Sequence, residues 1–171
     1  MIVACWSGPR NISTALMRSW SSRSDTFVTD EPFYAYYLSE TKLKHPMHME
    51  IINKYSTDYI KIVNYLNSKT PDGKKIWYQK HMAHHILNLN DIEWITNFEN
   101  CILLRHPKEV ISSYSNKNKL NSFEELGYRQ QYEIIKLLKK KNKSFIIIDS
   151  SELLQNPAKV LGAWCKKINI K

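Results

Sequence analysis

Short apolar runs alternate with helix-length segments along this chain, and this alternation limits the fold more than any other feature. The runs suit buried strands and cover residues 2–6, 26–29, 76–78, 101–104 and 145–148. Parallel neighbours in a sheet need long crossover connections, and a helix is the usual solution. The sequence therefore predicts a three-layer α/β/α fold with a mostly parallel central sheet. Because it has 171 residues and no linker-like stretch, we expect a single domain over residues 1–171.

Helix signals fill the spaces between these runs. Composition and apolar periodicity predict helices at 13–23, 34–38, 50–67, 91–98, 107–116, 122–141 and from Pro157 onwards. The segment 50–67 is the clearest amphipathic helix of the first half, because its apolar residues fall at spacings of three and four. Ser122 and Glu125 form a capping-box pattern, which is typical of the start of a helix.

Positive charge is concentrated near the C-terminal end. The formal net charge is +9, but residues 1–135 hold 16 basic and 14 acidic residues, whereas residues 136–171 hold 9 basic and 2 acidic ones. A lysine cluster of this kind is typical of a solvated helix end. Base readout favours arginine and exposed aromatic side chains, and only Arg129 lies near these lysines. We therefore expect no nucleic-acid partner.

The chain has no stretch that could cross a membrane, because its longest apolar runs fall far short of the roughly 20 residues that a bilayer requires. No basic and apolar leader of signal-peptide type follows Met1. The three cysteines, Cys5, Cys101 and Cys165, form no CxxC pair and are typical of reduced, buried thiols. These features predict a cytoplasmic protein without a membrane span.

The loop at residues 6–14 joins the first predicted strand to the first predicted helix. Ligands of such sheets bind at the carboxyl ends of the strands. Arg10, the hydroxyl groups of Ser13 and Thr14, and the free N–H groups of the helix start would together bind a phosphate or sulfate group. The alternative is a helix cap by Ser13 beside a surface arginine. The loop lacks the lysine of an ATP-binding Walker motif, although Asp149 could hold Mg²⁺ in a P-loop kinase.

A second strand–helix junction repeats this pattern at residues 103–113. Arg105 ends the strand and Ser113 lies on the helix that follows. Only five arginines are present, and two of them lie in these two loops. Arginine offers a planar fork that matches phosphate oxygens, so Arg10 and Arg105 suit a ligand with two separated anionic groups. Structural pairing with Glu31 or Glu109 is the alternative.

These loops resemble the nucleotide-binding motifs of sulfotransferases. Residues 9–14 (PRNIST) resemble the 5′-phosphosulfate loop PRSGTT, residues 105–113 (RHPKEVISS) resemble the 3′-phosphate motif RDPRDVxxS, and residues 151–157 (SELLQNP) resemble the later segment EDLLxDP. The WSGPRN loop and the DEPF segment are closest to bacterial sulfotransferase-like proteins. The resemblance implies a P-loop-containing nucleoside triphosphate hydrolase-like fold. It also implies 3′-phosphoadenosine 5′-phosphosulfate (PAPS) as donor, bound without a metal, and a small-molecule or glycan acceptor with a hydroxyl or amine.

The resemblance also assigns residue roles. The donor would be bound by Arg10, Asn11, Ile12, Ser13, Thr14, Arg105 and Ser113, the first five around the 5′-phosphate and the last two at the 3′-phosphate. Catalysis would fall to Glu31 or His81 as the base, with Lys80 assisting the leaving group. His81 comes one residue earlier than the histidine of the family's KTH motif. The spacing of His81, His84 and His85 also allows a zinc site, but no cysteine or carboxylate nearby completes a ligand set.

The chain departs from the family pattern in several places. Asn11 and Ile12 replace a small Ser-Gly pair, His106 replaces an aspartate, and Ser150 stands where a tyrosine is usual. The family's closing segment, resembling GxxGxWK, is expected to be missing. Either the chain is a shortened member or another chain supplies those contacts, so a homo-oligomer stays open. A degenerate member that binds a nucleotide or a partner without catalysis is the alternative to a sulfotransferase.

Overall fold

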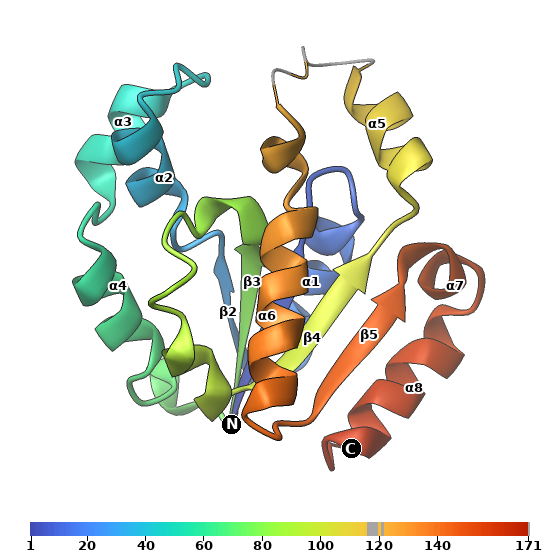
Figure 1. The fold of residues 1–171 in the computed structure, drawn as a ribbon. Helices are drawn as coiled ribbons and strands as arrows, with labels where there is room; N and C mark the ends of the chain where they lie inside the picture. The colour runs from blue at the N-terminus through green and yellow to red at the C-terminus, as the bar shows by residue number, and fades with distance from the viewer. Residues whose placement is uncertain (116–119, 121, 171) are drawn as a thin grey trace.

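Five parallel strands form the centre of the molecule in the computed structural model, which describes residues 1–115, 120 and 122–170 (Figure 1). The strands are β1 (Ile2–Ser7), β2 (Thr26–Asp30), β3 (Ile76–Met82), β4 (Glu99–Leu104) and β5 (Phe145–Asp149). They pair in the order β2-β3-β1-β4-β5, and every pairing is parallel. The predicted α/β fold is confirmed.

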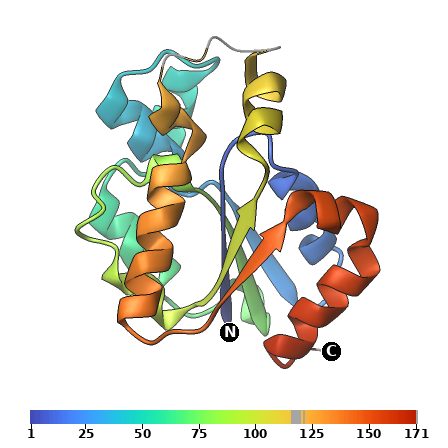
Figure 2. The same cartoon turned by 45° about the vertical axis from the view of Figure 1, so that its right-hand side comes forward.

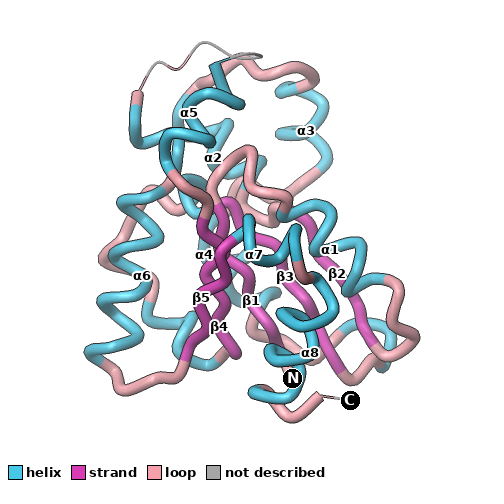
Figure 3. The backbone as a smooth tube through the Cα atoms, turned by 90° about the vertical axis from the view of Figure 1, so that its right-hand side faces the viewer, coloured by secondary structure: helices cyan, strands magenta, loops and turns pink. Residues whose placement is uncertain are grey.

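Helices cover both faces of this sheet, as the predicted three layers require. Figures 2 and 3 show α6 (Tyr128–Lys140) on one side of the strands and α1 (Ser13–Ser21) and α8 (Pro157–Lys167) on the other. Side chains alternate across β1, so Trp6 packs in the cluster with Ile134 of α6, while Cys5 packs in the cluster with Trp20 of α1 and Trp164 of α8. Both faces of β1 are therefore buried, which explains its uninterrupted apolar sequence.

A group of shorter helices lies beyond the carboxyl ends of the strands (Figure 1). They are α2 (Tyr34–Thr41), α3 (His48–Lys54), α5 (Pro107–Ser115) and the 3₁₀ turn η4 (Phe123–Leu126). The remaining elements are α4 (Tyr59–Leu66), α7 (Ser150–Gln155), η1 (Pro71–Gly73), η2 (Ala83–His85) and η3 (Glu93–Asn97). None of the helices in the described part of the chain is long and apolar enough to cross a membrane.

Two predicted helices are each divided in the structure. The segment 50–67 forms α3 and α4, because the chain is extended at Tyr55 and Asp58 accepts a hydrogen bond from the N–H of Lys61 (3.1 Å) to begin a new helix. The segment 122–141 forms η4 and then α6, since Gly127 adopts a left-handed conformation with φ of 77° between them. Position 116, the predicted end of α5, lies outside the described residues.

Candidate functional site

The loop between β1 and α1 folds into a cradle with open N–H groups. Arg10 and Ile12 both have positive φ values, 57° and 43°, which turn the chain sharply before the helix. Ile12 occupies the N-cap position and has no side chain that could cap the helix. The first N–H that bonds within α1 is that of Leu16, to the carbonyl of Ile12 (3.1 Å). The N–H groups of Ser13 and Thr14 are therefore open to an anion.

Two buried amides hold this loop against the end of β4. Asn11 donates to the carbonyl of Leu103 (2.6 Å). Gln131 of α6 donates to the carbonyls of both Trp6 and Leu103, each at 3.0 Å. Because Trp6 is in β1 and Leu103 in β4, Gln131 ties together the ends of the two strands from which the anion-binding loops leave.

The loop after β4 contacts the loop after β1 directly. Arg105 donates through Nη1 to the carbonyl of Arg10 (2.8 Å) and through Nε to Glu109 (3.0 Å). Arg10 in turn donates through Nε to the hydroxyl of Ser113 (3.0 Å). The structure thus brings both predicted motifs to one cavity of about 430 Å³, which also touches Glu31. Its walls include all seven residues assigned to the donor: Arg10, Asn11, Ile12, Ser13, Thr14, Arg105 and Ser113.

A buried lysine between two carboxylates forms one wall of this cavity. Lys80, at the end of β3, is 2% exposed, and its ammonium lies 2.7 Å from Asp30 and 2.5 Å from Glu31. Burial by itself would lower the pKa of Lys80, but the two carboxylates outweigh burial and raise that pKa above its usual value. The N–H of Glu31 also donates to the carbonyl of Lys80 (2.9 Å), which fixes the end of β2 against β3.

His81 points away from the cavity, contrary to its expected place as a base. Neighbouring residues of a strand face opposite sides, so Lys80 and Met82 line the cavity while His81 lies in the core on the other face. The ring of His81 stacks on Trp6 with centroids 4.2 Å apart, and the side chain is 1% exposed. Burial lowers the pKa of His81 to about 3. This placement does not support His81 as the base, because no acceptor in the cavity could reach its ring.

His84 and His85 lie in η2 and pack against an aromatic side chain of α2. The ring of Tyr37 stacks on His85 (centroids 4.7 Å apart) and meets His84 edge-on (5.3 Å). Within residues 1–115, 120 and 122–170, no group of three histidine, cysteine or carboxylate side chains is placed to hold a metal ion. The rings of both histidines are used in packing against Tyr37.

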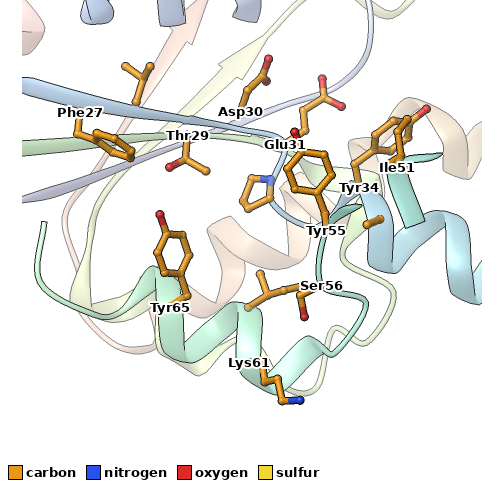
Figure 4. A pocket seen from close by; sticks show the side chains of 14 residues that line it. Phe27, Thr29, Asp30, Glu31, Tyr34, Ile51, Tyr55, Ser56, Lys61 and Tyr65 are labelled. Carbon is orange, nitrogen blue, oxygen red and sulfur yellow. The ribbon is translucent and has the colours of Figure 1, made fainter. Parts of the chain in front are cut away.

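A larger cavity of about 850 Å³ lies between β2 and α4. Figure 4 shows Phe27, Thr29 and Glu31 along β2 and the turn that follows it, opposite Tyr65 of α4. Glu31 lines this cavity as well as the smaller one, so this residue stands at the junction of the two. Sequence reasoning found Glu31, and it left open that the aromatic segments 33–37 and 55–65 line an acceptor pocket, with core packing as the alternative. Periodicity could not decide between the two, because it does not reveal that Tyr65 is 47% exposed.

Comparison with known proteins identifies the family. The model of the sulfotransferase domain family matches residues 1–171. The chain belongs to that family. The sulfotransferase domain of the Synechococcus PCC 7002 olefin synthase has a similar structure, with a TM-score of 0.65 and 18% identity, over 99% of this chain and 73% of that one. At 18% identity, this comparison shows a shared fold.

Two curated relatives from Arabidopsis thaliana match this sulfotransferase domain over almost its whole length. They are branched-chain-amino-acid aminotransferase-like proteins 2 and 1, which are 32% and 31% identical over 169 residues. The match covers 99% of this chain and 30% of each relative. The chain therefore spans about a third of the length of these relatives.

Proposed function

We propose that this domain transfers a sulfuryl group from PAPS to a hydroxyl or amine of an acceptor bound in the cavity between β2 and α4. One observation carries the proposal: Glu31 lines both the cavity of the two arginine loops and the larger cavity. A base in that position meets the donor from one side and the acceptor from the other. Reaction then depends chiefly on holding the two reactants in line.

The smaller cavity offers donors suited to two phosphate groups. The N–H groups of Ser13 and Thr14, with Arg10, suit the 5′-phosphosulfate. Arg105 uses Nη1 and Nε in the contacts described, which leaves its Nη2 for the 3′-phosphate. Ser113 accepts a hydrogen bond from Arg10, so its own O–H can still donate to an anion. The residues present therefore fit a bisphosphate nucleotide.

Each residue at the junction has a distinct task in the proposed transfer. Glu31 takes the proton of the acceptor as the acceptor atom forms its new bond to sulfur. The bond from sulfur to the bridging oxygen breaks, and its electrons stay on the 5′-phosphate of the nucleotide product. Arg10 and the N–H groups of α1 stabilise that charge. Lys80 keeps Glu31 in position and adds a positive charge at the reacting group.

Ligand-induced thermal stabilisation tests the donor assignment. We expect 3′-phosphoadenosine 5′-phosphate to raise the melting temperature without magnesium, and more than AMP does. Arg105→Ala should weaken binding of the bisphosphate about tenfold to a hundredfold, because a hydrogen bond to a charged group contributes roughly 1.5–3 kcal/mol. Arg18→Ala, on the exposed side of α1, is the control and should leave binding unchanged.

Three results would contradict the proposal. An unchanged preference for the bisphosphate over AMP in Arg105→Ala removes the basis for a 3′-phosphate site. Stabilisation by ATP that requires Mg²⁺ would instead favour a kinase. Stabilisation by the bisphosphate without transfer to any hydroxyl or amine acceptor would favour a member of the family that binds nucleotide without catalysis.

A further inference from the structure

Strand β2 forms one edge of the sheet, and some of its backbone N–H and C=O groups bond to no other strand. Since β2 ends the order β2-β3-β1-β4-β5, it pairs only with β3. Its bonds to β3 involve odd-numbered residues: Ile76 donates to the carbonyl of Asp25 (3.1 Å), and Glu31 donates to that of Lys80 (2.9 Å). In parallel pairing, alternate residues bond to the same neighbour. The N–H and C=O groups of Val28 and Asp30 therefore point away from the sheet.

The larger cavity runs along this edge. Four consecutive residues of β2, from Phe27 to Asp30, line it. Consecutive residues of a strand face opposite sides of a sheet, so a cavity that touches all four wraps around the edge. Across the part of the chain that the structure describes, no hydrogen bond reaches the N–H or C=O of Val28. These groups can be reached from the cavity.

The edge leads directly to the candidate base. Glu31 follows Asp30, the last residue of β2, and lies three residues after Val28, or about 10 Å at strand spacing. The opposite wall carries Tyr65 and Ile62 of α4, and Tyr55 stands at the end of α3 (Figure 4). Tyr55 is 56% exposed and lines the same cavity as Tyr65 and the strand edge, so the cavity has an aromatic surface. The other edge strand, β5, ends instead at Asp149, which lines neither cavity.

We propose that the acceptor is an extended polypeptide segment that pairs with β2 as an additional strand and presents a serine, threonine or tyrosine hydroxyl to Glu31. The inference rests on the proposed sulfuryl transfer for its chemistry. Main-chain pairing would give affinity through the free groups of Val28 and Asp30, and side chains of alternate peptide residues would pack on Tyr55 and Tyr65. An extended peptide repeats donors and acceptors at the spacing of this edge, which a sugar ring or a phenol does not.

Val28→Pro tests the pairing without disturbing the sheet. Proline removes the N–H that points into the cavity and no bond to β3, and an edge strand tolerates it at such a position. The assay follows ³⁵S transfer from labelled PAPS to a degenerate peptide mixture with a central serine, threonine or tyrosine, and to a panel of sugars and phenols. We expect kcat/KM for the peptides to fall about tenfold or more, through one lost hydrogen bond and a steric block. Val28→Ala keeps the N–H and should lower kcat/KM for the peptides far less than Val28→Pro does.

A second experiment uses the unchanged protein, so its result is valid even if the Val28→Pro variant does not fold. Peptides N-methylated at single positions lose one N–H each. If the peptide pairs with β2, methylation at every second residue should abolish transfer, while methylation at the residues between should be tolerated, because only alternate N–H groups face the edge. Equal tolerance at all positions would overturn the inference.

The outcomes separate this inference from the proposed function. Binding of 3′-phosphoadenosine 5′-phosphate together with labelling of sugars or phenols alone overturns the peptide acceptor and leaves the sulfotransferase. A loss of transfer in Val28→Pro that is equal for peptides and small acceptors also overturns it. No binding of that nucleotide and no labelling of any acceptor overturns the proposed function, and the inference with it.

Discussion

Glu31 shares the ammonium of Lys80 with Asp30, and this arrangement suits a residue that must gain a proton. An unpaired charge is costly in a buried position, and Lys80 is almost fully buried. When Glu31 takes up the proton of an acceptor, Asp30 still lies 2.7 Å from the ammonium and neutralises it. The buried lysine therefore keeps a partner in both protonation states of Glu31.

Glu31→Gln tests this role. The amide keeps the size of the side chain but cannot accept the proton, so kcat should fall by about 10² to 10⁴. Thermal stabilisation by 3′-phosphoadenosine 5′-phosphate should stay, because the arginine loops are unchanged. Glu40→Gln, an exposed position in α2, is the control for the loss of one negative charge. Turnover of Glu31→Gln near that of the unchanged protein would contradict the assignment of the base.

At the scale of single residues, the sequence predicted that Arg10, Arg105 and Glu31 lie together. All three follow predicted strands, and the carboxyl ends of parallel strands meet at one edge of the sheet. It misplaced His81 because a shift of one residue along a strand reverses the direction of the side chain. The exposure of Tyr55 could not be predicted, since it depends on where a helix ends and on what packs against it.

At the scale of elements, η4 lies directly against the β1–α1 loop. A Cβ atom added to Gly8 would come within 2.4 Å of the carbonyl oxygen of Leu126, the last residue of η4. Only glycine allows so close an approach. The position of the anion-binding loop therefore depends on a turn more than 100 residues away in the sequence.

Gly8→Ala should lower the free energy of unfolding by about 1–3 kcal/mol, because backbone rather than a flexible side chain must move aside. Urea unfolding measures the change. Gly162→Ala is the matched control: it lies in α8 with open space around its Cβ position, and we expect alanine to stabilise that helix by about 0.5–1 kcal/mol. A Gly8→Ala variant as stable as the unchanged protein would contradict the contact.

The sequence predicted the strands better than the helix boundaries. Each of the five apolar runs became a strand, and in the central strand β1 burial on both faces leaves an uninterrupted apolar signature. Apolar periodicity, in contrast, continued across the break between α3 and α4, although only α4 places side chains in the core cluster and α3 has no buried residue. Gly127 ends η4 in a left-handed conformation, and the capping-box pattern at Ser122 gave no sign of it.

At the scale of the whole molecule, His81 couples stability to pH. Its pKa is about 3 in the folded protein against 6.5 for an unperturbed histidine, so the unfolded chain binds the proton more tightly. The contribution of neutral His81 to the free energy of unfolding is complete above pH 6.5 and is lost as the pH falls toward about 3, the pKa of His81 in the folded protein. We expect the free energy of unfolding to decrease by about 1.4 kcal/mol per pH unit between pH 6 and 4 through His81 alone. Urea unfolding across this range measures it.

His81→Asn provides the comparison for this prediction. The variant is less stable at neutral pH because it leaves part of the ring's space on Trp6 empty, but its pH dependence should be shallower by the contribution of one histidine. An identical slope in the two proteins would show that His81 does not titrate as its burial requires. His84, whose pKa burial lowers to about 4, contributes equally to both proteins.

The side-chain amide of Gln131 binds the carbonyls of Trp6 and Leu103, so it connects α6 to the spacing of the two arginine loops. β1 and β4 are direct neighbours in the sheet, and Gln131 adds two hydrogen bonds at the point where their loops leave it, so the spacing of the two arginine loops depends on α6 as well as on the sheet. In the proposed complex, the distance between the two loops must match the distance between the two phosphate groups of the ligand. Nucleotides would then be selected by length as much as by charge, and a change on the far side of α6 could retune that choice without touching either arginine.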